Sequence, residues 1–386
     1  MNSRELMAAA LQGQPVSRLA VAPLYLHLYL AEKARCLALA GYRTWMGNRQ
    51  DMRVEPERVA SIQIEALRQA WEWLGETPDW IWTRQLPPAD WLAECILRQE
   101  GKRLWMIHKP SRERDELSNL FVASDSTEDR WDNPLPHSRS EVDSLVSVRP
   151  AEELLSSGRL DIARGLLAKL GKSVFVCGTM GSPFWTCYSI LGFQGLMTMP
   201  LDQPELLHYM LQRQTERLLA LANAYAAVGV HGVFVEECLT SADLISTSIY
   251  DEFVLPYDRA LLTELRALSL PSVLYVCGDV SPRLSRLAEL APTALAVEES
   301  KKGFRIDLAE VASAVGKQMT VFGNLDATQV KQWDDSEMAR QIAGQVLAAR
   351  PARGFIASIG SPFPLDTPRQ RVAALIAAAR AASLAG

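Results

Sequence analysis

The chain has 386 residues, of which 48% are hydrophobic and 22% are charged, as is typical of a globular protein with a large buried core. Its formal net charge of -5 argues against a nucleic-acid-binding protein, which would need a basic face. No apolar run in the sequence approaches the roughly 18 residues that a membrane-spanning helix requires.

The N-terminus and the cysteines bear on the cellular compartment. Residues 1–12 predict a short amphipathic helix rather than a signal peptide, because Glu5 comes early and no continuous apolar segment follows. No cysteine belongs to a Cys-x-x-Cys pair, so we expect reduced thiols in the cytoplasm. The structural alternative for each is a small buried apolar side chain. The six cysteines are Cys36, Cys95, Cys177, Cys187, Cys238 and Cys277.

The first part of the chain alternates between β-prone and helical patterns. Residues 20–28 predict a strand, and residues 30–40 predict a helix that ends at Gly41, the residue type favoured just past a helix end. A second helix is predicted over 56–74, with proline in its first turn. Residues 79–83 predict a tryptophan-rich strand.

Residues 91–150 interrupt this alternation. Two β-prone runs within 91–109 flank Gln99-Glu100-Gly101-Lys102, which predicts a hairpin. Residues 111–150 are polar and contain three prolines, so we interpret them as an excursion that serves as a lid or a partner surface.

Regular alternation then resumes, with helical patterns that include 204–228, 281–290 and 336–349. With the first two strands this makes eight β units, which predicts a single (β/α)8 TIM barrel domain over residues 1–386. The alternative is a doubly wound sheet, although the first strand lacks a Gly-x-Gly-x-x-Gly turn. The later strands are predicted at 174–177, 232–236, 273–277, 295–298, 320–322 and 355–358.

Polar residues follow the predicted strands at the end where barrel enzymes place their catalytic groups. Ionised groups are costly to bury without partners, so a mouth lined with carboxylates and thiols suits a metal or a positively charged substrate. The residues at the strand ends are His27, Trp82, Arg84, Cys177, Glu236, Glu237, Cys238, Cys277, Asp279, Glu298, Glu299, Lys301, Asn324, Asp326 and Ser361.

Some of these residues have structural alternatives. Cys177 and Cys277 end two alternate strands, so with Glu236 or Glu237 between them they could hold zinc and leave a position open for substrate. Alternatively, the two cysteines fill the top of the barrel as small residues. Asp279 is expected equally as a helix cap, and a surface ion pair with Lys301 is the preferred interpretation of Glu299.

The sequence resembles the uroporphyrinogen decarboxylase superfamily, which includes the porphyrin decarboxylase and zinc methyltransferases that act on methylcorrinoids. The resemblance covers most of the chain and is dense after about residue 230. The segments that carry it are Arg4-Glu5-Leu6 to Pro15-Val16-Ser17-Arg18, Phe253-Val254-Leu255-Pro256-Tyr257, Leu274-Tyr275-Val276-Cys277-Gly278-Asp279, Leu295-Ala296-Val297-Glu298-Glu299, Val321-Phe322-Gly323-Asn324-Leu325-Asp326, Gly354-Phe355-Ile356 and Gly360-Ser361-Pro362-Phe363-Pro364-Leu365-Asp366-Thr367-Pro368.

The chain departs from the resembling enzymes at their metal site. The zinc methyltransferases have His-x-Cys-Gly where this chain has Tyr275 before Cys277, and a later Gly-Cys where it has Ser361. Neutral tyrosine and serine are poor zinc ligands, so the usual site cannot form, although a different set with Cys277 and Glu236 or Glu237 remains open. The Arg-Gln-Ala-Gly-Arg and Gly-His-Gly segments of the porphyrin decarboxylase are missing as well.

The resemblance implies a methyltransferase that moves a methyl group between a small methylated substrate, a corrinoid carrier and a thiol or pterin acceptor. Cys277 would be a metal ligand or a reactive thiolate, with a glutamate as second ligand or general base. The implied cofactors are zinc and a corrinoid, and the implied partners are the small-molecule substrate and a corrinoid protein; a homodimer is compatible with the sequence. The candidate catalytic residues are Cys277, Glu237, Tyr275 and Asp279, the candidate metal ligands are Cys277, Glu236, Glu237 and Cys177, and the candidate substrate-binding residues are His27, Arg84, Asn324, Asp326 and Ser361.

Two other functions stay open at this point. A metal-free decarboxylase or lyase would need a cation for the substrate carboxylate, which Arg43, Arg49, Arg84 or Lys301 could supply. A non-catalytic partner of a corrinoid protein would instead use the hairpin region and the tryptophans as an interface.

Overall fold

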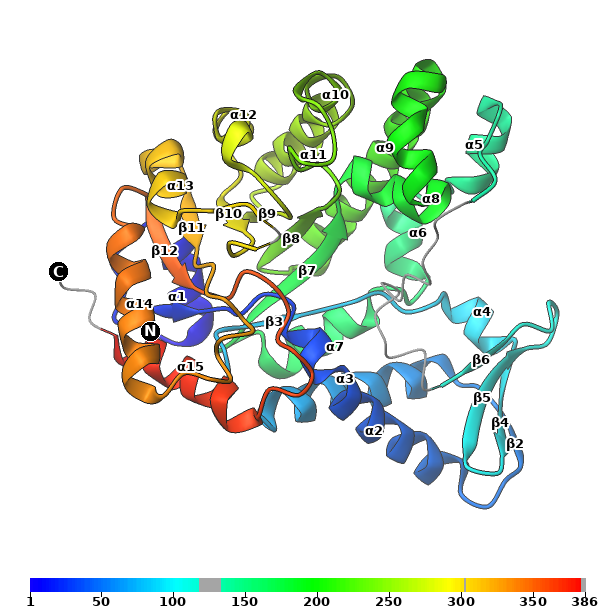
Figure 1. Cartoon of the computed structure of the whole chain (residues 1–386). Helices are drawn as coiled ribbons and strands as arrows, with labels where there is room; N and C mark the ends of the chain where they lie inside the picture. The colour runs from blue at the N-terminus through cyan, green and yellow to red at the C-terminus, as the bar shows by residue number, and fades with distance from the viewer. Residues whose placement is uncertain (118–132, 302, 383–386) are drawn as a thin grey trace.

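The computed structural model describes residues 1–117, 133–301 and 303–382, and it confirms the (β/α)8 barrel. Eight parallel strands form one sheet in the order β1-β12-β11-β10-β9-β8-β7-β3, with helices around it (Figure 1). The strands are β1 (Ala20–Val21), β3 (Trp80–Trp82), β7 (Phe175–Gly181), β8 (Gly232–Glu237), β9 (Ser272–Val276), β10 (Ala294–Val297), β11 (Thr320–Phe322) and β12 (Gly354–Ala357).

The helices follow the strands in the predicted alternation. The predicted helix over 204–228 has the bounds of α9, and the helix predicted over 336–349 is shifted by one residue because Asp334 caps α14. The α-helices of the described residues are α1 (Ser3–Leu11), α2 (Leu26–Met46), α3 (Pro56–Glu72), α4 (Ala89–Ala93), α5 (Arg139–Leu145), α6 (Ala151–Ser156), α7 (Asp161–Leu170), α8 (Pro183–Asp202), α9 (Pro204–Val228), α10 (Thr247–Phe253), α11 (Leu255–Ala267), α12 (Leu284–Leu290), α13 (Leu308–Val315), α14 (Asp335–Ala348) and α15 (Arg369–Ala381).

Two predictions near the N-terminus were wrong in their bounds. The strand predicted over 20–28 is only two residues long, because Tyr25 adopts a left-handed conformation (φ 53°) and α2 begins at Leu26. His27 therefore lies in the first turn of a helix and not at the end of a strand. The helix also runs past Gly41, where a Cβ atom would lie 2.9 Å from the Ile62 side chain, so this glycine allows α2 and α3 to pack closely and ends no helix.

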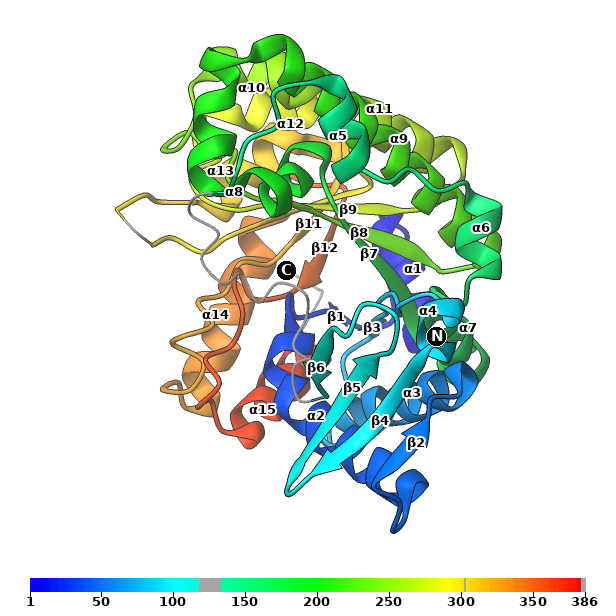
Figure 2. The same ribbon diagram turned by 90° about the vertical axis from the view of Figure 1, so that its right-hand side faces the viewer.

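The predicted hairpin is confirmed as part of a second, antiparallel sheet, which lies beside the barrel (Figure 2). Its strands pair in the order β2 (Asp51–Arg53), β4 (Cys95–Glu100), β5 (Arg103–His108) and β6 (Arg114–Glu116). Gly101 turns between β4 and β5 at a φ of 61°, which only glycine adopts readily. Residues 118–132 of the excursion expected over 111–150 lie outside the described residues, so its role as a lid or partner surface stays a prediction.

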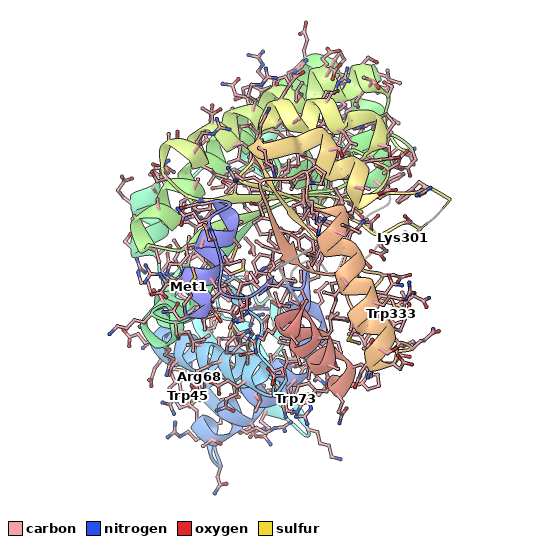
Figure 3. The ribbon with its side chains drawn as sticks, turned by 90° about the vertical axis from the view of Figure 1, so that its left-hand side faces the viewer. Met1, Trp45, Arg68, Trp73, Lys301 and Trp333 are labelled. Atoms are coloured by element: carbon pink, nitrogen blue, oxygen red, sulfur yellow. The ribbon has the colours of Figure 1, made fainter. Side chains whose placement is uncertain are left out.

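The barrel has an apolar interior and an apolar layer between its strands and helices. Successive residues of a strand face opposite sides, so Phe234 of β8 packs inside while Val233 and Val235 pack against the helices. The same alternation directs Glu236 into the barrel and Glu237 away from it. Helix α1 lies across the end of the barrel opposite the second sheet (Figure 3).

In the described part of the chain, no helix is both long enough and apolar enough to cross a lipid bilayer.

The seam between the first and second barrel strands depends on Asp79. Its backbone N–H donates to the Val21 carbonyl (2.8 Å), and its fully buried carboxylate accepts from the Val21 N–H (2.8 Å) and from the Ser3 hydroxyl (2.5 Å). Arg18 adds a two-pronged ion pair at 2.5 and 2.8 Å. One carboxylate thus joins β1, β3 and α1.

We expect Asp79→Asn to lower the free energy of unfolding by about 3 kcal/mol, because the Arg18 guanidinium loses its charge partner in a largely buried setting. Urea denaturation measures this loss. Asp51→Asn is the matched control, since its ion pair with Arg98 is exposed, and we expect it to change the free energy of unfolding much less than Asp79→Asn does. Equal effects of the two substitutions would contradict this role for Asp79.

Candidate active site

A cavity of about 1140 Å³ opens at the mouth of the barrel, beside the ends of β3, β7 and β8. Helices α2, α3, α8 and α9 supply further walls. Of the residues predicted at the strand ends, His27, Arg84 and Glu236 line this cavity together with Trp82. The cavity therefore occupies the half of the mouth formed by the N-terminal strands.

Glu236 is held at the cavity wall by two donors from different elements. Its Oε1 accepts from the Tyr25 hydroxyl at 2.5 Å, and its Oε2 accepts from the Trp185 indole N–H at 3.2 Å. Burial, followed by the charge of Glu236, raises the pKa of Tyr25 well above its usual value, so Tyr25 stays protonated and donates. The carboxylate is thereby fixed in one orientation.

Aromatic rings surround this carboxylate. Tyr25 makes edge contacts with Trp82, Phe234 and Tyr275, with ring centroids 5.6, 5.8 and 5.2 Å apart. Trp82 and Phe234 approach to 4.3 Å between centroids. Such rings bury large apolar area and prefer edge or offset contacts, so the wall is rigid and suits a flat or methyl-bearing ligand.

His27 and Arg84 contribute nitrogen-containing side chains to this wall. Burial, followed by the charge of Arg84, lowers the pKa of His27 to about 4, so its ring is neutral at pH 7. The ring lies 4.8 Å from that of Trp82. Burial lowers the pKa of Arg84 to about 10, which still leaves it a cation at neutral pH, and its guanidinium donates to the Gln63 side chain. The cavity thus presents a positive charge beside apolar rings.

Cys277 follows β9 and lies outside the lining that the described residues form. Its backbone N–H donates to the Glu237 carbonyl at 3.1 Å. The Cys277 thiol, followed by burial, raises the pKa of Cys238 well above its usual value. The Cys238 thiol in turn lies 3.7 Å from Glu236 Oε1. Cys277 is therefore connected to the cavity through Cys238.

The residues predicted to bind metal do not converge. Cys177 pairs with Gly232 at the start of β8, whereas Tyr275 pairs with Glu236 four residues further along, so Cys177 lies deep in the barrel and Cys277 near its mouth. Burial also raises the pKa of Cys177, which disfavours the thiolate that a metal needs. Among the described residues, no group of three or more histidine, cysteine, aspartate or glutamate side chains could hold a metal ion.

Glu237 points away from the mouth, toward the helices. It is fully buried beside Asp258 of α11, and burial raises its pKa to about 7. The pKa of Asp258 is raised too, by burial and by the charge of Glu237. The two carboxyl groups are hydrogen-bonded to each other, which favours sharing a proton, and they lie in the layer between the strands and the helices.

Three further predicted site residues are engaged in local hydrogen bonds. Asp279 accepts from the Ser281 N–H at 3.0 Å in a local turn, whereas Val280 holds the N-cap position of the short helix that follows, without a side-chain cap hydrogen bond. Asp326 accepts from the N–H (2.8 Å) and the hydroxyl (2.6 Å) of Thr328. The Asn324 amide donates to the Glu298 carbonyl at 3.0 Å and accepts from Gln345 at 3.0 Å, and its backbone N–H donates to the same glutamine side chain. These hydrogen bonds position loops.

The remaining polar residues form a network at the ends of β10 and β12. Ser361 donates to Glu299 at 2.6 Å, and the Lys301 ammonium lies 2.8 Å from Glu298 and 3.4 Å from Glu299. Both glutamates are only 4% exposed, so the ion pair expected at the surface is largely buried. The Tyr275 hydroxyl donates to the Gly360 carbonyl at 2.9 Å. This hydrogen bond holds the Tyr275 hydroxyl away from the cavity.

Sequence reasoning missed Tyr25, Trp185 and the linking role of Cys238. Tyr25 stood inside a run predicted as a strand, and its left-handed conformation has no clear mark in the sequence. Trp185 lies in the first turn of α8, where Ser182 caps the helix and Pro183 opens it. That Ser-Pro start was a readable signal for a helix close after β7.

We expect His27 to titrate near pH 4 in the folded protein, which NMR of the imidazole protons measures. Because the unfolded chain binds this proton at about pH 6.5, the contribution of His27 to stability is present above pH 6.5 and is lost as the pH falls toward 4. Relative to His27→Gln, the wild-type protein should lose about 2 kcal/mol of unfolding free energy between pH 7.5 and pH 5. His231, whose pKa is also lowered to about 4, is present in both proteins and cancels. A titration midpoint near 6.5 would contradict the burial of His27.

Comparison with known proteins relates most of the chain to one family. A methyltransferase from Methanosarcina mazei shares the fold with a TM-score of 0.66 at 19% identity, over 98% of both chains. The methylated-thiol–coenzyme M methyltransferase of Methanosarcina mazei is 25% identical over 205 residues, which cover 51% of this chain and only 53% of that protein. The uroporphyrinogen decarboxylase of Aromatoleum aromaticum is 27% identical over 259 residues, which cover 64% of this chain and 69% of that protein. The family model for uroporphyrinogen decarboxylase matches residues 125–382, and the chain therefore belongs to the uroporphyrinogen decarboxylase family.

Proposed function

We propose that this protein is a methyltransferase that moves a methyl group between a small methylated substrate, a corrinoid carrier and a thiol or pterin acceptor. The observation that carries the proposal is Glu236, a carboxylate fixed by Tyr25 and Trp185 at the wall of an aromatic cavity. A thiol attacks a methyl group as the thiolate, so the acceptor has to lose its proton first. Glu236 is placed to accept that proton.

The proposed step balances without a further reactant. The acceptor S–H proton passes to the Glu236 carboxylate, and the sulfur lone pair forms the new S–CH3 bond. The bond between the methyl group and its donor breaks, and its electron pair stays with the donor. The relative from Methanosarcina mazei, named for a methylated thiol and coenzyme M, supports a thiol acceptor. The aromatic wall supports a methyl-bearing ligand.

The donor set described here does not fit the zinc ion that the resemblance implied. Glu237 faces the helices, Cys177 lies deep in the barrel, and both oxygens of Glu236 accept hydrogen bonds. We therefore route no step through zinc. The corrinoid, free or on a partner protein, stays part of the proposal as the methyl carrier.

Elemental analysis of the purified protein tests the metal question directly. We expect much less than one zinc ion per chain, and no gain in methyl transfer when zinc is added. Cys277→Ala should leave the metal content unchanged, and Cys36→Ala, an exposed thiol, is the matched control. Stoichiometric zinc that is lost only in Cys277→Ala would show that a site forms on Cys277 after all.

Glu236→Gln should lower kcat for methyl transfer from methylcobalamin to coenzyme M by about 100-fold or more, because the amide cannot accept the proton. The amide keeps the shape of the side chain, so substrate KM should change much less. Asp115→Asn is the control, since Asp115 also lines the cavity with a carboxylate, and it should keep activity within about twofold. Full activity of Glu236→Gln would exclude Glu236 as the base.

A carboxy-lyase is the second candidate, and the buried Arg84 in the cavity favours it. Arg43 instead donates to the Lys102 carbonyl at 2.9 Å and Arg49 to the Met52 sulfur at 3.0 Å, outside the cavity lining of the described residues. Release of CO2 from a carboxylate substrate that is abolished in Arg84→Gln but intact in Cys277→Ala would support the lyase over the methyltransferase.

A further inference from the structure

A second hollow of about 280 Å³ adjoins the main cavity on the side of α6, α8 and α9. Arg149, Arg159 and Arg217 line both the small hollow and the main cavity. The three guanidinium groups therefore gather where the two spaces meet. Gln214 lines the small hollow only.

Two of these arginines have no carboxylate partner in the described part of the chain. Arg149 pairs with Glu153, but the ion pairs of the described residues include neither Arg159 nor Arg217. The Arg217 Nε donates to the side chain of the buried Gln214 at 2.8 Å. The Arg159 Nε is buried and has no hydrogen-bond partner among the described residues.

The arrangement holds like charges together at a cost. Burial lowers the pKa of Arg217, and the charge of Arg159 lowers it further. Burial also lowers the pKa of Arg159, with Arg149 as the next cause. Both arginines stay cationic at neutral pH, because arginine starts from a very high pKa. A bound anion would remove both the repulsion and the unmet hydrogen bonding.

The backbone fixes these arginines relative to the main cavity. The Arg159 carbonyl accepts from the Leu86 N–H at 2.9 Å, which ties it to the segment that follows β3. Arg217 lies within the 25-residue helix α9. Arg213, one turn earlier on the same helix, is bound by Asp143 at 3.0 Å and by Glu216. Arg213, which does not line the hollow, therefore has carboxylate partners, whereas Arg217, which lines it, has none among the described residues.

We propose that Arg159 and Arg217, with Arg149 at the rim, form an oxyanion subsite for a carboxylate, sulfonate or phosphate group. Guanidinium groups bind such oxyanions with two parallel hydrogen bonds, which suits a pair of convergent arginines. The inference rests on the proposed function, because it concerns the substrate of the Glu236 site. That substrate carries an oxyanion at the end remote from Glu236. The hollow is large enough to take the anionic group together with the part of the substrate that carries it.

Thermal unfolding of the full chain tests the subsite with inorganic phosphate, methanesulfonate and acetate as probes, at constant ionic strength. A ligand that binds only the folded state raises Tm, so the wild-type protein should gain stability with at least one probe, and the responding probe identifies the oxyanion. Isothermal titration with that probe should show binding weakened about tenfold or more in Arg159→Gln and in Arg217→Gln. Arg217→Lys keeps the charge without the planar fork and should weaken binding less than Arg217→Gln.

Arg213→Gln is the matched control and should bind the probe as the wild-type protein does. Both glutamine variants should unfold in anion-free buffer at a Tm close to that of the wild-type protein, because each loses a repulsive charge. Equal binding by all variants, or no stabilisation of the wild-type protein by any probe, would overturn the subsite. Glu236→Gln should keep probe binding while it loses methyl transfer, so the subsite and the proposed reaction fail or survive separately.

Discussion

The hydrogen bond from Tyr25 to Glu236 is the constraint on which the mouth of the barrel depends. Tyr25 follows the first strand and Glu236 ends the fourth, so the bond spans the mouth and does not join neighbouring strands. The left-handed backbone conformation of Tyr25 costs free energy. Such a conformation persists only where surrounding contacts hold the residue in place. Here three aromatic neighbours and the partly buried Glu236 carboxylate supply those contacts. Such strain is concentrated at functional sites, in agreement with a site built around Glu236.

This bond divides the mouth into two halves of different character. The half formed by β1, β3, β7 and β8 contains the cavity, with rings, the Arg84 cation and an oriented carboxylate. In the half formed by β9 to β12 the polar side chains contact one another, as Lys301 does with Glu298 and Ser361 with Glu299. Polar residues at strand ends are therefore not equivalent. Only those whose hydrogen-bonding atoms or charges face open space are available to a ligand.

The barrel was predictable because its pattern is local and repeated, whereas the site depends on long-range geometry. Strands and helices alternate with a clear period, so even the bounds of α9 followed from the sequence. The period of two also implied that Glu236 and Glu237 face opposite sides, but which one faces inward depends on strand register. The separation of Cys177 from Cys277 likewise follows from the pairing of β7 with β8. Neither cysteine by itself shows how its strand pairs with the next one, so the separation of the two thiols could not be predicted from the sequence.

The two residues that replace zinc ligands of the resembling zinc methyltransferases have structural roles of their own. Tyr275 and Ser361 stand where the resembling enzymes have metal ligands, and here each donates its hydroxyl proton within the protein, to Gly360 and to Glu299. Lys301 contacts both buried glutamates and offsets one of their two negative charges. Cys277 is left with a thiol partner, Cys238, which leads to Glu236. Proton transfer at Glu236 and anion binding at the arginines are then the chemistry that this mouth supports best.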